Sequence, residues 1–301
     1  MTLDLRDRTI LITGATSGIG KSTALALARR GARLILACRS KERTLAVIEE
    51  ITRTSGQPDV DVSFVPLDLG DLASVRACAD RVNAMPGPLH VLINNAGLAG
   101  AGGLTKDGFE VAFGTNHLGP FLLTLRLLDK LRASAPARIV NVSSRAHRRP
   151  KDIDLSVQRQ PKRSPTGLYE YSVSKLANIL FTKELARRLA GTGVSVYCLH
   201  PGVVASEIWR RVPAPVRWLM NLTMISNDEG AQTTLYCATE PAIAGDSGHY
   251  YVRRQLARPT PQAEDPALAQ RLWAASAAWV GEDLSPAPAG APVAGAQARR
   301  E

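Results

Sequence analysis

Residues 9–28, TILITGATSGIGKSTALALA, place a strand, a glycine-rich turn and a helix in immediate succession. The run before Gly14 is typical of a buried strand, and apolar residues recur at helical spacing after the turn. Gly14 permits a tight turn, Gly18 lets the backbone approach a phosphate, and Gly20 allows the helix to pack closely on the sheet. The spacing is GxxxGxG rather than GxGxxG, but the flanking strand and helix supply the context that the motif requires. We therefore expect the N-terminus of this helix to bind the pyrophosphate of a dinucleotide.

The alternation of strand and helix continues outward from this stretch to about residue 205. Apolar runs rich in Ile, Val and Leu precede helical patterns: RTILITG, ARLILAC, VSFVPLD, LHVLINN, ARIVNVSS and VSVYCLHPG. Such strands indicate a parallel sheet covered on both faces. The sequence thus predicts the α/β class, with a doubly wound parallel sheet (Rossmann fold) in a single domain over residues 1–283. GHYYV is a candidate for one more strand, and the Pro/Ala/Gly-rich residues 284–301 predict a disordered tail.

Composition and charge limit the function classes. The first residues carry charges where a signal peptide needs an unbroken apolar stretch, and no apolar run of about 18 residues follows, so we expect a cytoplasmic protein. The four cysteines lie far apart, and the histidines lack metal-ligand spacing, so neither a disulfide nor a metal is expected. The formal net charge is +10, but the arginines are dispersed without interleaved aromatic residues, which argues against a nucleic-acid groove. An anionic cofactor or a membrane surface suits this charge better.

Two cations near the turn indicate which dinucleotide binds. The second strand ends at ACRSKER, where a protein that prefers NAD usually places an acid for the ribose 2′-hydroxyl. This sequence places Arg39 there, and Lys21 follows Gly20. A guanidinium and an ammonium favour the 2′-phosphate of NADP, whereas a carboxylate would repel it. The alternative is that both are ordinary solvated cations.

Motifs along most of the chain resemble those of one family. They are TGATSGIG, LDL at Asp68, NNAG, NHLG at Asn116, NVSS, YSVSK and HPGVV, and they follow one another in the family's order and spacing. Over residues 6 to 282 the sequence resembles the short-chain dehydrogenase/reductase family. Less specific stretches, such as ACRS and SKLANILFTKELARRL, resemble its retinol dehydrogenase-like branch. It departs from that branch by lacking the N-terminal hydrophobic anchor common among the animal enzymes, and by Ser206 where many members have threonine.

The resemblance implies that NADP(H) contacts residues from several strand ends. It assigns the adenine amine to Asp68 and the adenosine ribose to the NNAG turn. The alternatives are that Asp68 caps the following helix, and that Asn94 and Asn95 only hold neighbouring strand ends. The expected cofactor-binding residues are Gly14, Thr16, Ser17, Gly18, Ile19, Gly20, Lys21, Arg39, Asp68, Leu69, Asn95, Ala96, Gly97, Tyr171, Lys175, Pro201, Gly202 and Val204.

Two tyrosines in YEYSVSK, residues 169–175, compete for the catalytic role. A carbonyl that accepts hydride needs a proton at its oxygen, which a phenol can supply. Tyr171 and Lys175 are four residues apart, so on a helix they share a face and the ammonium can lower the pKa of the phenol. Tyr169 has Val173 at that offset and fails this test. Tyr171 is therefore the predicted acid, and Lys175 is also expected to hold the nicotinamide ribose.

Ser144 and Asn116 complete the expected catalytic set. In the family pattern the second serine of NVSS binds the substrate oxygen, and Ser143 before it would point to the other side of an extended chain. Asn116 would kink its helix by bonding backbone and water, and so link Lys175 to bulk solvent as a proton relay. Helix capping is the alternative for an isolated asparagine.

The segment 207–226 interrupts the alternation of strands and helices. It follows the strand that ends at HPG, at the edge where open α/β sheets bind ligands. Its tryptophans, methionines and valines predict an apolar lid over the nicotinamide, suited to a hydrophobic alcohol or carbonyl substrate such as a retinoid, a steroid, or a long-chain ketone or aldehyde. Its arginines leave open a membrane contact through 207–225, and core packing is a third alternative. An oligomer is compatible with the sequence.

Two function classes follow. One is an NADP-dependent oxidoreductase acting on CH–OH and C=O groups, and the other is a catalytically silent NADP-binding sensor or scaffold on the same fold. Ser144, Tyr171 and Lys175 are all present. They favour the enzyme, because a sensor has no need of a matched proton donor.

Overall fold

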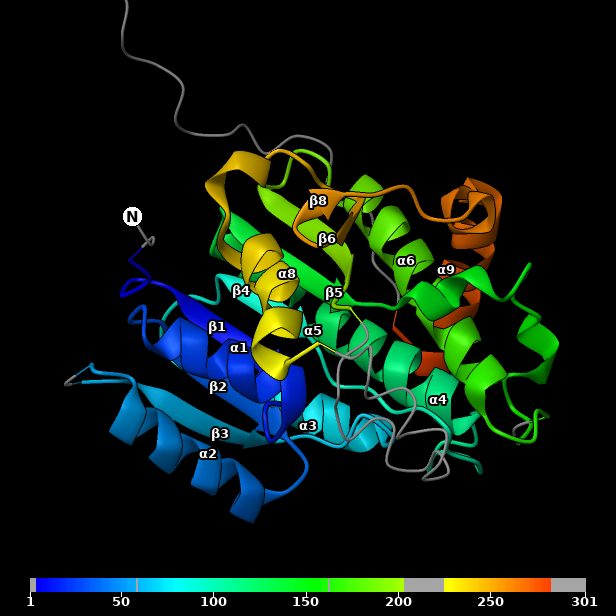
Figure 1. Ribbon diagram of the computed structural model, residues 1–301. Coiled ribbons are helices and arrows are strands. Elements are labelled where there is room, and N and C mark those ends of the chain that lie inside the picture. The colour runs from blue at the N-terminus through cyan, green and yellow to red at the C-terminus, as the bar shows by residue number, and fades with distance from the viewer. Residues whose placement is uncertain (1–3, 58, 162, 203–224, 283–301) are drawn as a thin grey trace, which may run out of the picture.

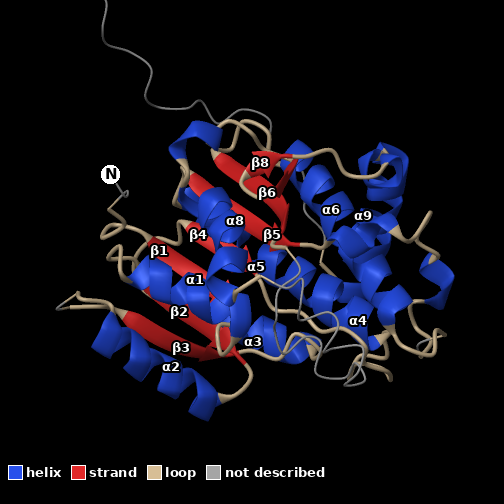
Figure 2. Ribbon diagram, in the orientation of Figure 1, coloured by secondary structure: helices blue, strands red, loops and turns tan. Residues whose placement is uncertain are grey.

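The computed structural model describes residues 4–57, 59–161, 163–202 and 225–282. In these ranges an eight-stranded sheet lies between two layers of helices (Figure 1). Figure 2 shows the strands side by side, with helices in front of and behind them. The doubly wound α/β fold predicted from the sequence is confirmed, as a single domain.

The sheet has the order β3-β2-β1-β4-β5-β6-β7-β8. Its strands are β1 Thr9–Thr13, β2 Arg33–Cys38, β3 Val62–Pro66, β4 Val91–Asn94, β5 Ala137–Val142, β6 Val194–His200, β7 His249–Val252 and β8 Gln255–Leu256. Strands β1 to β7 are parallel, and β8 is antiparallel to β7. Every apolar run singled out in the sequence forms a strand, and GHYYV supplies β7. The order reverses between β1 and β4, and ligands of open α/β sheets bind at the carboxyl ends of the strands at such a point.

Helices cover both faces of the sheet. They are α1 Gly18–Ala28, α2 Lys41–Thr54, α3 Leu72–Ala84, α4 Val111–Phe113, α5 Gly119–Ala133, α6 Leu168–Arg188, α8 Asn227–Thr239 and α9 Pro266–Val280. Apolar residues of α1, α2 and α8 share a core cluster with one face of the sheet. Those of α3, α5 and α6 share a cluster with the other face, and α9 packs against α6 (Figure 1).

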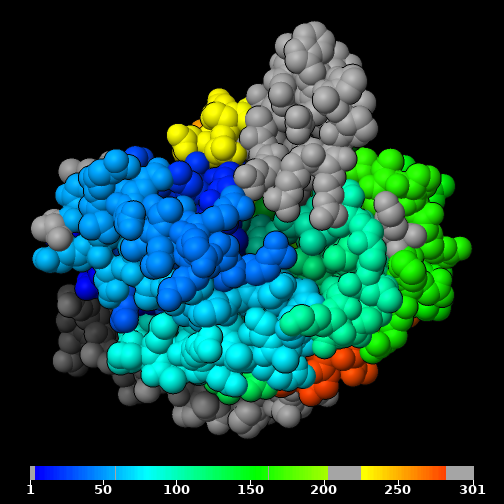
Figure 3. All heavy atoms as spheres, turned by 90° about the horizontal axis from the view of Figure 1, so that it is seen from below, coloured from blue at the N-terminus to red at the C-terminus, as the bar shows by residue number. Residues whose placement is uncertain are grey.

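Strand β1 shows why the sequence folds in this way. All five of its residues are buried. Leu11 packs in the core beside α3 and α5, whereas Ile10 and Ile12 pack beside α1 and α2. Because successive side chains point to opposite faces, a strand buried on both faces must be apolar throughout. On the face seen in Figure 3, the blue-to-cyan surface of the first third of the chain adjoins the green surface of its middle.

Candidate active site

A cavity of about 600 Å³ lies at the carboxyl ends of β1, β4, β5 and β6. Its lining runs from Gly14 to Gly202 and contains every predicted cofactor-binding residue except Lys21 and Val204. Val204 lies outside the described residues. Ser144 also lines the cavity. The structure therefore brings together, at the predicted edge of the sheet, residues that are distant in the sequence.

The glycine-rich turn forms one wall of this cavity. A Cβ on Gly20 would lie 2.5 Å from the Gly14 carbonyl oxygen and also against the Asn95 side chain, so α1 packs onto the strand ends only without one. Gly14, at φ +70°, could carry a Cβ only 2.7 Å from that of Ala96. Ser17 at the N-cap is extended, and within the described chain its side chain does not cap the first turn of α1. The N–H groups of that turn suit an anionic diphosphate, so the turn fits the pyrophosphate of a dinucleotide.

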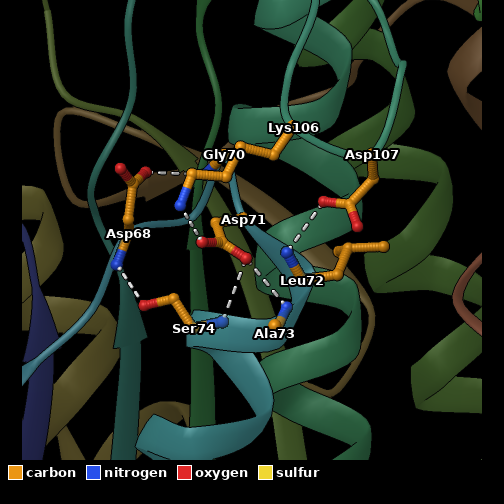
Figure 4. Close-up of polar contacts among 8 residues, drawn as sticks. All are labelled: Asp68, Gly70, Asp71, Leu72, Ala73, Ser74, Lys106 and Asp107. Carbon is orange, nitrogen blue, oxygen red and sulfur yellow. Dashed lines mark hydrogen bonds and ion pairs between the residues drawn. The ribbon is translucent and has the colours of Figure 1, made fainter.

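Asp68 follows β3 and lines the cavity, and Figure 4 shows its polar contacts. Its backbone N–H donates to Ser74 Oγ at 2.9 Å, and its Oδ1 accepts from the Gly70 N–H at 2.9 Å. The cap of α3 is Asp71, whose Oδ1 accepts from the N–H groups of Ala73 and Ser74. Helix capping therefore does not account for Asp68, whose carboxylate lies at the cavity wall.

Asn94 and Asn95 hold neighbouring strand ends, as one interpretation of the NNAG motif expected. Asn94 Nδ2 donates to Thr124 Oγ1 at 3.0 Å and to Asn141 Oδ1 at 2.9 Å. Asn95 Nδ2 donates to the Thr13 carbonyl at 2.9 Å. Asn95 also lines the cavity, so this residue both holds the end of β1 and contributes to the cavity wall.

Tyr171 and Lys175 lie on one face of α6 at the cavity, and Tyr169 does not. The Tyr171 side chain is hydrogen-bonded with that of Ser144, and Lys175 Nζ lies 5.6 Å from the centre of the Tyr171 ring. Lys175 Nζ also donates to the Val142 carbonyl at 2.9 Å. Tyr169 is 42% exposed and is absent from the cavity lining. The helical spacing therefore selected the tyrosine that the fold places beside Ser144.

The pKa of Tyr171 corrects one expectation. The sequence predicted that Lys175 would lower it, but burial raises the pKa of the phenol and the hydrogen bond with Ser144 only partly offsets this. Burial also lowers the pKa of Lys175 to about 8. The net shift of Tyr171 is upward because its desolvation outweighs its favourable contacts.

Ser144 begins a short 3₁₀ turn, Arg145–Arg148, directly after β5. Its Oγ accepts from the Ala146 N–H at 3.2 Å, which leaves the hydroxyl proton available as a donor. Ser143 Oγ instead donates to the Lys175 carbonyl at 2.7 Å. The two serines thus serve different partners, as the alternation along an extended chain predicts.

Asn116 lies in a π-helical turn, Gly114–Leu118, between α4 and α5. Its Oδ1 accepts from the Leu98 N–H at 2.9 Å, and its Nδ2 donates to the Leu98 carbonyl and to Ser174 Oγ, each at 2.9 Å. The expected distortion of the helix is present, and helix capping is not the role of this side chain. A Cβ on Gly97 would lie 3.3 Å from Asn116 Oδ1 and 3.4 Å from Lys175 Nζ, so both polar groups lie close to this glycine.

The family model described as short chain dehydrogenase matches residues 8–216. The chain belongs to the short-chain dehydrogenase/reductase family. It is 46% identical over 278 residues to Dehydrogenase/reductase SDR family member 13 of Bos taurus, spanning 90% of this chain and 73% of that protein. It is 46% identical over 275 residues to Retinol dehydrogenase 11 of Homo sapiens, spanning 90% of this chain and 85% of that protein.

Solved structures of short-chain dehydrogenases have the same fold. An uncharacterised protein from Mycobacterium Paratuberculosis is 36% identical, with a TM-score of 0.74 over 94% of this chain and 97% of its own. A short chain dehydrogenase from Burkholderia cenocepacia J2315 in complex with NADP is 26% identical, with a TM-score of 0.66 over 82% of this chain and 96% of its own.

Near the glycine-rich turn of this short-chain dehydrogenase/reductase, the sequence named one cation that does not line the cavity. Lys21 Nζ forms an ion pair with Glu50 Oε2 of α2 at 2.6 Å, so its ammonium is held against α2. Arg39 lines the cavity as predicted. Arg43, in the first turn of α2, lines it too and was missed, although it stands in the same ACRSKER stretch.

The predicted lid at 207–226 and the predicted tail at 284–301 lie outside the described residues. Within the four described ranges, no helix is both long and apolar enough to cross a membrane. In the same ranges, no three His, Cys, Asp or Glu side chains are grouped so that they could hold a metal ion.

Proposed function

We propose that this short-chain dehydrogenase/reductase transfers hydride between NADP(H) and an apolar alcohol or carbonyl compound. The observation that carries the proposal is the hydrogen bond between the Tyr171 and Ser144 side chains in a dinucleotide-sized cavity, with Lys175 beside the Tyr171 ring. A buried phenol at such a wall is a matched proton donor for a carbonyl oxygen. A protein that only binds the dinucleotide needs none of these contacts.

In the direction of reduction, bound NADPH supplies the hydride. The Ser144 hydroxyl accepts from Ala146 and so presents its proton to the substrate oxygen, which it holds beside Tyr171. Tyr171 gives its phenol proton to that oxygen as the alcohol forms. Because burial raises the pKa of Tyr171, the phenol is protonated at neutral pH. The Lys175 ammonium stabilises the phenolate that remains.

Lys175 and Asn116 are the groups that we assign to proton return. Asn116 fixes the loop at Leu98 through two hydrogen bonds and approaches Lys175 across the Gly97 backbone. A water bridging these polar groups would carry a proton from solvent to Lys175 and then to Tyr171.

The cofactor preference for NADP(H) is supported by Arg39 and Arg43 at the end of β2 and the start of α2. A guanidinium can bind the 2′-phosphate with two parallel hydrogen bonds. The NADP complex of the Burkholderia cenocepacia relative agrees with this preference. Lys21 has a smaller part in the proposal because Glu50 already neutralises it.

The apolar substrate class is supported by the named relative Retinol dehydrogenase 11 and by the apolar composition of residues 207–226. The test is to follow NADPH oxidation with a panel of hydrophobic ketones and aldehydes, including retinoid and steroid carbonyls. We expect turnover with large apolar carbonyls and weaker turnover with small ones. If NADPH binds but no carbonyl is reduced, the catalytically silent alternative holds instead.

A further inference from the structure

The cavity continues past Ser144 to an end lined by Arg145, Ala146 and His200. His200 ends β6, is 4% exposed, and has an Nδ1 atom with no hydrogen-bond partner among the described residues. A buried polar atom of this kind usually has a partner, from the protein, a water or a ligand. We call this end the basic end of the cavity. It consists of Arg145 and His200 in the cavity lining, with Arg148 in the turn that follows Ser144 and Arg253 directly after Val252, the strand partner of His200.

Two more unpartnered polar atoms belong to His147 and to Tyr250, whose ring contacts His147. His147 is fully buried, and its Nδ1 donates to the Ser144 carbonyl at 2.7 Å, which leaves Nε2 with no partner in the described structure. The Tyr250 ring stands edge-on to His147, with 5.2 Å between ring centres, and its hydroxyl is also unpartnered among those residues. The described residues therefore leave polar atoms of His147, His200 and Tyr250 without hydrogen-bond partners.

The charge at the basic end has one sign. Burial, and to a smaller extent the charges of Arg145, Arg148 and Arg253, lower the pKa of His200 to about 4, so the imidazole is neutral. No carboxylate among the described residues forms an ion pair with any of these three arginines. A site that gathers cations around a neutral imidazole, with no acid among its described residues, is suited to an oxyanion.

The backbone supports a functional reason for Arg253. The turn between β7 and β8 places Arg253 at φ 51° and Arg254 at φ 63°, in the left-handed region. Tight hairpins of this kind ordinarily use Asn-Gly, because side chains are disfavoured at positive φ. Two successive arginines in that conformation are a local strain of the kind found at ligand sites.

We propose that the basic end binds a carboxylate of the substrate, so that the preferred substrates are apolar oxo acids and their hydroxy acid counterparts. The pyrophosphate and the 2′-phosphate of the dinucleotide are accounted for by α1 and by Arg39 and Arg43, at the other end of the cavity. An anion beyond Ser144 therefore belongs to the substrate. This inference rests on the proposed function, because it names the substrate class of the same site.

The experiment compares a long-chain oxo acid with its methyl ester, which carries the same carbonyl and chain but no charge. We expect kcat/KM for the acid to exceed that for the ester by about threefold to tenfold at low salt, the range for charge-assisted contacts at a partly exposed site. Added salt should narrow the ratio, because exposed charges are screened.

A matched pair of variants assigns the effect. Arg253→Gly and Arg254→Gly each remove one arginine from the same turn, and each places glycine where positive φ favours it, so both should fold. Of these two arginines, only Arg253 contributes to the electrostatic environment of His200. Arg253→Gly should lose most of the preference for the acid with the ester unaffected, and Arg254→Gly should keep it.

The outcomes separate this inference from the proposed function. If no carbonyl of the panel is reduced, the proposed function fails. If other apolar carbonyls are reduced but neither the acid nor the ester is, the enzyme is active and the carboxylate site is wrong. If both are reduced with equal kcat/KM, the proposed function is supported and the proposed carboxylate site is wrong. A preference for the acid that survives Arg253→Gly unchanged also overturns the assignment to the basic end.

Discussion

The reaction end and the phosphate end of the cavity differ in how their groups are held. At the reaction end, Tyr171 and Lys175 are buried at 5% and 3% exposure, and each is bonded to its surroundings. At the phosphate end, Arg39 and Arg43 are exposed cations on the rim. Interactions of buried groups are poorly screened, whereas exposed charges are weakened by water and salt. Changes at the reaction end should therefore have large effects, and changes at the phosphate end moderate ones.

The largest effect is expected from Tyr171→Phe. It removes the proton donor but keeps the ring, so kcat should fall by about a hundredfold to ten-thousandfold, the usual range for a general acid. NADPH affinity, measured by fluorescence titration, should change little. Tyr169→Phe is the control, because this exposed ring lies outside the cavity lining. Equal losses of kcat in the two variants would show that the reaction end does not depend on Tyr171.

The next effect is the cofactor preference of the phosphate end. Wild-type protein should bind NADPH roughly tenfold to a hundredfold more tightly than NADH, because a bidentate charge-assisted contact from Arg39 is made only with the 2′-phosphate. Arg39→Asp should reverse the order by placing a carboxylate there. Dissociation constants for both cofactors, at low and moderate salt, measure this. If the wild type binds NADH more tightly, or if Arg39→Asp leaves the ratio of the NADPH and NADH dissociation constants unchanged, Arg39 is an ordinary surface cation.

A pH profile tests the charge of Lys175. Its pKa is lowered to about 8, so the ammonium is complete well below that pH and is lost as the pH rises through it. In the free enzyme, kcat/KM for NADPH in the reductive direction should fall with rising pH, by about tenfold per unit above that pKa. Lys175→Met should remove this limb of the profile as well as most of the activity. A wild-type profile that stays flat through that pH would show that the charge of Lys175 is not needed.

The smallest effect is expected from Lys21→Met. Lys21 is paired with Glu50 and does not line the cavity, so NADPH affinity should change by less than about twofold, as for an ordinary surface substitution. Arg43→Met is the comparison, and it should weaken NADPH more than NADH. If Lys21→Met weakened NADPH as strongly as Arg39→Asp does, cofactor binding would break the Glu50 pair.

The fold was predictable because its strands are buried on both faces. All five residues of β1, TILIT, are buried, so polar residues could not replace them without loss of stability. The glycines after β1 are required because α1 closely approaches Gly14 and Asn95. The position of Tyr171, rather than Tyr169, beside Lys175 in the cavity was also predictable, because residues four apart share a helix face.

Other features depend on packing between distant segments. The pairing of Lys21 with Glu50 requires α1 and α2 to lie side by side, which no local pattern shows. The upward shift of the Tyr171 pKa depends on burial, which the sequence does not quantify. The basic end depends on the pairing of β6 with β7, which places Arg253 near His200, and no local pattern in the sequence shows that pairing.

The central claim is tested most directly by isotope transfer from NADPH deuterated at both C4 positions. A large apolar ketone is incubated with the wild-type protein, and the alcohol product is analysed by mass spectrometry. The account predicts deuterium on the carbinol carbon with wild-type protein and with Tyr169→Phe, and almost none with Tyr171→Phe. Failure of the wild type to form any deuterated alcohol, across the panel of apolar carbonyls and with NADPH bound, would contradict it.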